Sequence, residues 1–229
     1  MRTDPAGTLA GARTPMAVAG RAITMRLGER LVLDAVDLDV EPGTFAALTG
    51  PSGAGKSTLL WILGRALEPT GGSVTYSGRL LPDREAAARA GVVLVPQGNA
   101  LVTPLTAREN LLVPLLMLGI PAKEAHARAD AALTLVGLDD SGTHLVEELS
   151  GGQQQRVAVA RGLAARPSIL LADEPTSDLD ATTREIIVGL LRAEAEAGAA
   201  VLMSTHDSWC ADQSDVEYHL DDGHVERRR

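Results

Sequence analysis

The stretch Gly50-Pro51-Ser52-Gly53-Ala54-Gly55-Lys56-Ser57-Thr58 decides how the rest of the chain is interpreted. It follows the pattern of a phosphate-binding loop, in which Gly and four further residues precede Gly-Lys and a Ser or Thr. The apolar residues 44–49 before it predict a buried strand, and residues 58–67 after it predict a helix with an apolar face. A strand, a glycine-rich loop and a helix, in this order, are the context that the pattern requires.

The residue types of this loop suit the binding of a triphosphate. Gly50, Gly53 and Gly55 let the backbone turn where a Cβ would clash, so that several N–H groups point into one concave anion site. The following helix adds the positive end of its dipole. Lys56 is predicted to reach the β- and γ-phosphates, and the Ser57 hydroxyl is a predicted ligand for Mg²⁺. The alternative is a glycine-rich turn before a core helix, without a ligand.

The composition restricts the class of protein. With 229 residues, of which 45% are apolar and 22% charged, the chain can bury the core of a globular protein. Its formal net charge of -9 argues against nucleic acid as the main ligand, because phosphate backbones are bound by clustered Lys and Arg. The one cysteine, Cys210, allows no internal disulfide, and we therefore expect a reducing compartment.

No stretch of the sequence predicts a membrane span. The most apolar one, Leu111–Ile120, has about half of the roughly 20 residues required, and Pro114 interrupts it. Residues 1–20 are rich in Ala, Gly and Thr, lack the apolar run of a signal peptide, and are predicted to form a disordered leader. We expect the protein to reach a membrane only by binding another chain.

Strands and helices alternate along most of the chain. Residues 17–40 predict two or three half-buried strands before a turn at 41–43. Further strands are predicted over 73–77, 91–96, 168–172 and 199–204, and helices over 82–90 and 182–197. The buried face of the last helix is expected to consist of Ile186, Ile187, Leu190 and Leu191. With a closing hairpin across Asp221-Asp222-Gly223, this order predicts an α/β fold with a mostly parallel sheet.

Residues 98–166 form a helical insertion by their pattern. Helices are predicted over 106–118, 122–136 and 150–166, and Thr106 with Glu109 is a capping-box signature. We therefore predict one domain over 21–229. Residues 21–97 and 167–229 form its core and antiparallel strands, and about 98–166 form a helical subdomain.

A second motif, Ser168-Ile-Leu-Leu-Ala-Asp173-Glu174, is a predicted strand that ends in two carboxylates. Ligands of parallel α/β sheets bind at this carboxyl edge. Asp173 is predicted to hold Mg²⁺ through a water, and Glu174 to orient or deprotonate an attacking water. A strand that ends in a solvated acidic turn is the alternative.

A third motif, Leu149-Ser150-Gly151-Gly152-Gln153, opens a predicted helix. Its glycines expose N–H groups at the positive helix end, which makes it a second candidate anion site. Because one chain hardly needs two triphosphate sites, we expect this one to serve a nucleotide bound by another copy. The alternative is a glycine-rich cap without a ligand.

Together these motifs resemble those of the nucleotide-binding subunit of an ATP-binding cassette (ABC) transporter, over about residues 22–225. The loop at 50–57 resembles the family's Walker A, Gln97 its Q-loop, 149–153 its signature motif, 169–174 its Walker B, Ser177-Asp178-Leu179-Asp180 its D-loop, and His206 its switch histidine. All six occur in the family's order. The signature motif is the most specific, because phosphate loops occur in many other NTPases.

The resemblance implies a P-loop NTPase core with a mostly parallel sheet, an N-terminal antiparallel β subdomain and a helical insertion. It implies ATP and Mg²⁺ as cofactors, and a head-to-tail dimer with a second copy or a paralogous cassette. Each ATP would touch the Walker A of one copy and Ser150 and Gly152 of the other, and Gly151, Gln153 and Asp180 are further predicted nucleotide-binding residues. Lys56, Glu174, Gln97 and His206 would be catalytic, with Gln97 also near Mg²⁺ and His206 at the γ-phosphate.

Two positions depart from the family pattern. Leu27 stands where the family usually has an aromatic residue stacked on adenine, so apolar contact replaces ring stacking. Asp178 fills a D-loop position that is often Ala, and it is expected to alter contacts across the dimer.

The resemblance further implies an ATPase that powers a separate membrane permease from the cytoplasmic, inner face of the cell membrane. Residues 101–118 and 137–139 look similar to those of lipoprotein-releasing and macrolide-export cassettes, with lipoproteins, peptides or drugs as cargo. The apolar Leu111–Met117 is explained equally by permease docking and by helix core. An ATP-gated regulator that transports nothing is an alternative. A cassette of DNA repair or chromosome structure is disfavoured by the modest gap between the first two motifs, and one of translation by the single cassette in this chain. The acidic charge argues against both.

Overall fold

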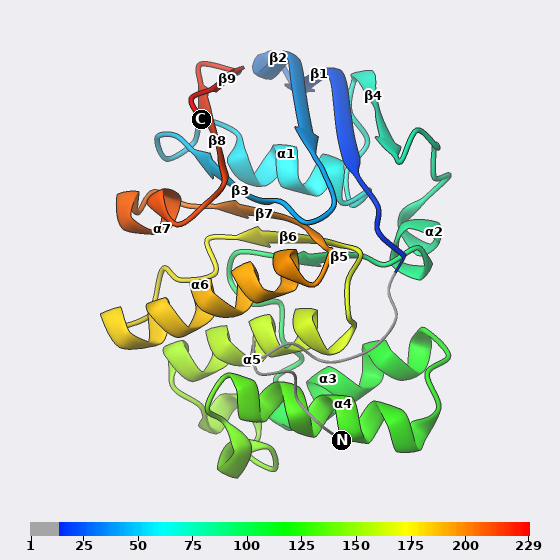
Figure 1. Cartoon of the computed structure of the whole chain (residues 1–229), viewed down its shortest axis with the longest axis vertical. Coiled ribbons are helices and arrows are strands. Elements are labelled where there is room, and N and C mark those ends of the chain that lie inside the picture. The colour runs from blue at the N-terminus through cyan, green and yellow to red at the C-terminus, as the bar shows by residue number, and fades with distance from the viewer. Residues whose placement is uncertain (1–13) are drawn as a thin grey trace.

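Two β-sheets and a group of helices make up the described part of the chain, residues 14–229 of a computed structural model (Figure 1). A three-stranded antiparallel sheet has the order β2-β1-β4 and comprises β1 (Val18–Leu27), β2 (Arg30–Val40) and β4 (Gly71–Tyr76). The predicted leader over 1–20 is therefore too long, since Val18 already pairs with Val40 and Tyr76. Residues 1–13, which make up most of that leader, lie outside the described residues.

The second sheet has six strands in the order β5-β6-β7-β3-β8-β9. They are β5 (Val92–Val95), β6 (Ile169–Asp173), β7 (Ala200–Ser204), β3 (Phe45–Thr49), β8 (Val216–Asp221) and β9 (His224–Arg227). All neighbours are parallel except β8 and β9, which form the predicted closing hairpin. The predicted α/β fold with a mostly parallel sheet and a separate antiparallel subdomain is confirmed.

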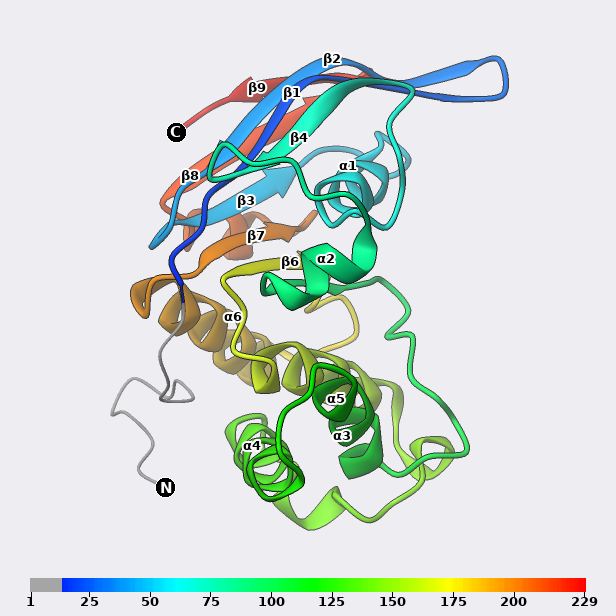
Figure 2. The same ribbon diagram turned by 90° about the vertical axis from the view of Figure 1, so that its right-hand side faces the viewer.

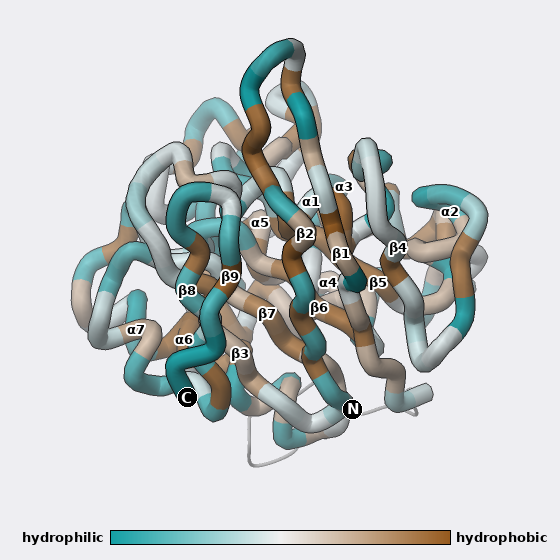
Figure 3. Tube along the Cα trace, turned by 90° about the horizontal axis from the view of Figure 1, so that it is seen from above, coloured by the Kyte–Doolittle hydropathy of each residue, from teal (hydrophilic) through white to brown (hydrophobic). Residues whose placement is uncertain are grey.

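Strands β3, β6 and β7 are almost entirely buried on both faces, so their side chains alternate between two cores. Ile169 and Leu171 of β6 face the core shared with the antiparallel sheet and α1 (Lys56–Leu63). Leu170 and Ala172 face the other core, where α6 (Ala181–Glu196) and the helical subdomain pack. This two-sided burial explains why these strands are nearly continuous apolar runs, coloured brown in Figure 3.

The helical subdomain consists of α3 (Ala107–Met117), α4 (Ala122–Leu135) and α5 (Gly151–Ala164), with two short 3₁₀ turns between α4 and α5. Figure 2 shows these helices below the parallel sheet, on the side away from the antiparallel sheet. The predicted capping box is present, because the Glu109 N–H donates to the Thr106 hydroxyl at 3.2 Å and the Thr106 N–H donates to the Glu109 carboxylate at 2.8 Å. No helix of residues 14–229 combines the length and apolar character needed to cross a membrane.

Three details of the helices differ from the sequence predictions. Helix α1 spans Lys56–Leu63 rather than 58–67, because Gly64 caps it and Arg65 has a positive φ of 56°. In α6 the buried face includes Ile187, Leu190 and Leu191, but Ile186 is half exposed. Helix α2 (Arg84–Arg89) lies within the predicted range, whereas α7 (Ser208–Asp212) was not predicted.

The hairpin between β1 and β2 projects beyond the rest of the molecule (Figures 2 and 3). Leu27 ends β1 and pairs with Arg30, which begins β2, so only Gly28 and Glu29 form the turn. Gly28 has a positive φ of 62°, as tight hairpin turns require. This projection brings both ends of the turn toward the loop that follows β3.

Candidate functional site

Four adjacent parallel strands carry the predicted chemistry at one sheet edge. The phosphate-type loop follows β3, His206 follows β7, Asp173 ends β6 and Gln97 follows β5. Because parallel strands present their carboxyl ends at the same edge, these residues meet around one pocket of about 480 Å³. The pocket is lined by Leu27, Arg30, Val32, Ser52, Gly53, Gly55, Lys56, Ser57, Thr58, Gln97, Asp173, Glu174, Ser177 and His206.

The loop from Gly50 to Gly55 has the backbone of an anion-binding cradle. Gly50, Gly53 and Gly55 all have positive φ, at 143°, 77° and 107°. A Cβ on Gly50 would lie only 2.1 Å from the Leu220 carbonyl oxygen, so a side chain cannot fit there without a backbone shift. Gly55 is the N-cap of α1 and offers no capping side chain, which leaves the first N–H groups of the helix available to an anion.

The Lys56 ammonium is buried at the base of this cradle. It donates to the carbonyl oxygens of Gly50 at 2.8 Å and Pro51 at 3.1 Å, and its Nζ lies 3.9 Å from Glu174 Oε1. Two of its three N–H donors are thus held by the loop itself. A bound phosphate would receive the remaining donor or compete with these carbonyls for the others.

Asp173 has the properties of a metal ligand in this pocket. Its Oδ1 accepts a hydrogen bond from the Ser204 hydroxyl at 2.6 Å, whereas its buried Oδ2 has no hydrogen-bond partner among the described residues. A buried carboxylate oxygen without a partner is costly unless a ligand satisfies it. With the Ser57 hydroxyl and the Gln97 side chain lining the same pocket, the donor set consists of oxygens that suit Mg²⁺.

Glu174 is buried and lies between Lys56 and His206, the two side chains of the pocket that contact its carboxylate. Its Oε2 lies 3.0 Å from His206 Nδ1, and its Oε1 faces Lys56. The His206 ring is largely exposed, in contrast to Glu174. A carboxylate held in this way is placed to orient a water molecule in the pocket and to accept a proton from it.

The outer end of the pocket is formed by the β1–β2 hairpin. Leu27 is 53% exposed there, and Arg30 donates from Nη2 to the Gly53 carbonyl at 3.1 Å. The sequence reasoning placed Leu27 at a nucleotide base but missed Arg30, Val32 and Ser177 as lining residues. The position of Arg30, three residues after Leu27 across a two-residue turn, was the signal that could have identified it.

The predicted signature residues lie outside this pocket. Ser150 caps α5 in a capping box with Gln153, in which the Ser150 N–H donates to the Gln153 side chain at 2.9 Å. Ser150 and Gly151 are exposed, and no atom lies within 4 Å of a Cβ built on Gly151. The structure therefore presents this helix end to solvent, not to the chain's own phosphate-type loop.

The predicted D-loop packs directly against this exposed helix end. A Cβ on Gly152 would lie 3.2 Å from the Asp178 carbonyl oxygen. Asp180 does not line the pocket, because its carboxylate caps α6 by accepting from the Thr183 N–H and hydroxyl at 3.0 and 2.8 Å. The backbone hydrogen bond from Thr183 lowers the pKa of Asp180.

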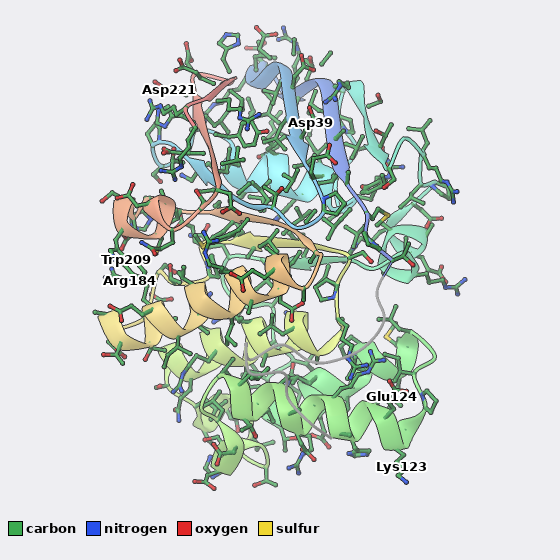
Figure 4. All side chains as sticks on the ribbon, viewed as in Figure 1. Asp39, Lys123, Glu124, Arg184, Trp209 and Asp221 are labelled. Atoms are coloured by element: carbon green, nitrogen blue, oxygen red, sulfur yellow. The ribbon has the colours of Figure 1, made fainter. Side chains whose placement is uncertain are left out.

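An ion pair connects this region to the segment that follows His206. Arg184 of α6 binds the Asp207 carboxylate, and its guanidinium lies over the Trp209 ring at 5.1 Å (Figure 4). Asp207 also caps the unpredicted helix α7 by accepting from the Cys210 N–H. These contacts between α6 and α7 connect the start of α6, where Asp180 lies, to the segment after β7 that carries His206.

Comparison with known proteins identifies this combination of fold and site. The ABC transporter family profile matches residues 33–177. The lipoprotein-releasing system ATP-binding protein LolD 1 of Rhodopirellula baltica is 43% identical over 208 residues, covering 88% of this chain and 91% of that protein. The macrolide export ATP-binding/permease protein MacB of Azoarcus sp. is 38% identical over 97% of this chain and 35% of the longer protein. The dimeric ATP-binding cassette MJ0796 bound to ADP and Pi superposes with a TM-score of 0.82 at 35% identity, covering 93% of this chain and 99% of that one. The chain belongs to the ABC transporter family, as an ATPase cassette.

Proposed function

We propose that this cassette hydrolyses Mg²⁺-ATP between two copies arranged head to tail, and so energises a separate membrane permease. The observation that carries the proposal is the separation of two half-sites within one chain. The pocket holds Lys56, Asp173, Glu174 and His206, whereas Ser150 and Gly151 are exposed on α5 outside it. Each half-site is incomplete alone, and a second copy supplies the missing half.

The residues of the pocket have separate tasks in this proposal. The loop N–H groups and Lys56 bind the phosphates, and Ser57, Gln97 and Asp173 hold Mg²⁺. When bound, the cation neutralises charge that develops on the phosphate oxygens. Glu174 orients the attacking water and accepts its proton, and His206 holds Glu174 and reaches the γ-phosphate. Ser150, Gly152 and the neighbouring N–H groups of the second copy close the site over the nucleotide.

A groove lies between α2, β5, α3 and α5, and we propose it as the docking site of the permease. It has a volume of about 690 Å³, and its apolar lining includes Val102, Val113 and Met117, of which Met117 is 81% exposed. Arg161 also lines the groove, and it donates to the carbonyl oxygens of Asn99 and Ala100 at 2.7 and 2.6 Å. Since these carbonyls follow Gln97 closely, a permease helix seated in the groove would act on the loop that reaches the ATP pocket.

The relatives suggest the class of transport. LolD belongs to a lipoprotein-releasing system and MacB to macrolide export, and both match this chain over most of its length. We propose that the permease of this cassette extracts or exports a lipoprotein, peptide or drug. The cassette would then work at the inner face of the cell membrane, held there by the permease.

Reconstitution with a candidate permease from the same genome tests the proposal. We expect Mg²⁺-dependent ATP hydrolysis by the cassette alone and a higher rate in the complex. Met117→Asp should abolish co-purification and the rate increase while leaving the hydrolysis of the isolated cassette unchanged, because Met117 lies outside the ATP pocket. Leu80→Asp is the matched control, since Leu80 is also an exposed apolar residue but lines neither pocket. Equal effects of both substitutions would contradict docking in this groove.

A further inference from the structure

Ser204 lies behind the two acidic residues of the ATP pocket, at the last position of β7. It is fully buried and stands opposite Asp173 in the pairing of β6 with β7. It does not line the pocket. A hydroxyl in an otherwise apolar run, Ala200–Met203, is unexpected in the centre of a buried sheet unless its hydrogen bonds are needed.

The Ser204 hydroxyl is bonded to both acidic residues. It lies 2.6 Å from Asp173 Oδ1, and the Glu174 N–H donates to it at 2.9 Å. A hydroxyl has a single hydrogen, and an ionised carboxylate can only accept, so this hydrogen is donated to Asp173. The direction of both hydrogen bonds is therefore fixed.

These bonds decide which oxygen of Asp173 is free. Oδ1 accepts a hydrogen bond from Ser204, whereas Oδ2 is buried and has no hydrogen-bond partner within residues 14–229. Rotation of the carboxylate would break a short, charge-assisted hydrogen bond, which is about twice as strong as a neutral one. Ser204 thus holds Oδ2 available for a cation.

The same hydroxyl supports a strained backbone at Glu174. This residue has a φ of 49°, in the left-handed region that residues other than glycine rarely adopt. Its N–H is held by Ser204, and its carbonyl accepts from the Ser177 hydroxyl at 3.2 Å and from Gln155 at 3.4 Å. Strained backbone conformations persist where surrounding contacts hold them in place. At Glu174 these hydrogen bonds direct the carboxylate toward His206.

We propose that Ser204 is a positioning residue for the reaction: its hydroxyl sets the orientation of Asp173 toward the cation and the backbone of Glu174 toward the attacking water. This inference rests on the proposed function of the pocket. His206, the other residue that contacts Glu174 from this segment, follows Ser204 by two residues at the end of β7.

Ser204→Ala tests the proposal with a readout other than hydrolysis. The protein is saturated with adenylyl imidodiphosphate, and the binding of Mn²⁺, which replaces Mg²⁺ and is visible by electron paramagnetic resonance, is titrated. We expect the variant to bind Mn²⁺ about tenfold more weakly, the loss of one charge-assisted hydrogen bond. Its affinity for the nucleotide in EDTA should stay within about twofold, since the phosphate loop is intact. Single-turnover hydrolysis should fall roughly 10- to 100-fold.

Two further variants keep the test decisive. Ser214→Ala removes another buried serine hydroxyl, one that donates to the Ala211 carbonyl away from the pocket, and it should leave Mn²⁺ binding unchanged. Ser204→Thr keeps the hydroxyl, and it should retain most of the Mn²⁺ affinity. It also serves as the test if the alanine variant does not fold.

The outcomes separate this inference from the proposed function. Mn²⁺ binding by Ser204→Ala equal to that of the unaltered protein would overturn the positioning role, as would an equal loss of nucleotide affinity in EDTA, which would indicate a general structural defect. A folded Ser204→Thr protein that loses Mn²⁺ affinity as Ser204→Ala does would also overturn it. Failure of the unaltered protein to bind the nucleotide at all would instead refute the proposed function.

Discussion

Substituting the first glycine of the phosphate loop should damage the fold far more than substituting the second. Gly50 and Gly53 both have positive φ, but their surroundings differ. A Cβ on Gly50 would lie 2.1 Å from the Leu220 carbonyl oxygen of β8, whereas a Cβ on Gly53 has no atom within 4 Å. Gly50→Ala and Gly53→Ala are therefore a matched pair that separates steric overlap from backbone strain.

The geometry sets the size of the difference. An alanine at either position carries the cost of positive φ, about 1–2 kcal/mol. At Gly50 the backbone must also move by about 0.9 Å before the contact with Leu220 reaches the 3.0 Å that real Cβ atoms respect. Such overpacking adds about 1–3 kcal/mol, because the obstacle is main chain in a paired strand and not a flexible side chain. We expect Gly50→Ala to lower the free energy of unfolding by about 2–5 kcal/mol and Gly53→Ala by about 1–2 kcal/mol.

Thermal and urea unfolding of the nucleotide-free proteins measure this difference. For a chain of this size, a loss of 1 kcal/mol lowers the Tm by about 2–4 °C, so the Tm of Gly50→Ala should fall by about 4–20 °C. Measuring without nucleotide ensures that altered binding does not contribute to the apparent stability. Equal losses in the two variants, or a Gly50→Ala protein as stable as the unaltered one, would refute the steric argument.

Three further predictions concern the proposed base-binding end of the pocket and the pH dependence of stability. Leu27→Tyr should tighten ATP binding about fivefold or more, because ring stacking on a base contributes about 1–3 kcal/mol, and binding of tripolyphosphate should not change. Arg30→Ala should weaken ATP binding without changing tripolyphosphate binding. Arg26→Ala is the control, because Arg26 lies on the same hairpin but outside the pocket, and it should change neither affinity. Calorimetric titration measures all of these affinities. Burial raises the pKa of Tyr76, whose hydroxyl donates to the Leu63 carbonyl at 2.7 Å, so its stabilisation is complete below the unfolded pKa near 10 and is lost as the pH rises further. Tyr76→Phe should be about 1–2 kcal/mol less stable in urea at pH 7, with a smaller difference at pH 11, and a constant difference would contradict this linkage.

The sequence predicted the fold well because its parallel strands are apolar runs that end in recognisable motifs. The strands β3, β6 and β7 lie at the predicted places, and the sheet order brings their carboxyl ends together. Short helices, and helices with apolar residues on more than one side, were harder to predict. Helix α7 has five residues, too few for a helical period, and depends on the Asp207 cap. Ile186 belongs to the apolar pattern of α6, yet it is half exposed within residues 14–229.

The residues of the candidate site that belong to short, continuous sequence motifs could be predicted. Lys56, Asp173, Glu174, Gln97 and His206 line one pocket, as the order of motifs indicated. Contacts between segments distant in sequence could not be read from the chain. Arg30 meets the loop 23 residues later, and Ser204 meets Asp173 only because β7 pairs with β6. Asp180 uses both carboxylate oxygens to cap α6 through Thr183, three residues later, and its contact with nucleotide stays a prediction.

The molar mass of the Glu174→Gln variant in solution, measured with and without ATP, tests the central claim most directly. The substitution removes the proton acceptor but keeps the size of the side chain and leaves Lys56 and the phosphate loop in place. By light scattering during gel filtration, the variant should be a monomer alone and a dimer with Mg²⁺-ATP, and Ser150→Arg on the same background should prevent the dimer. A Glu174→Gln protein that binds ATP yet stays monomeric at every concentration, or one whose dimer is unaffected by Ser150→Arg, would contradict two half-sites that close on each other.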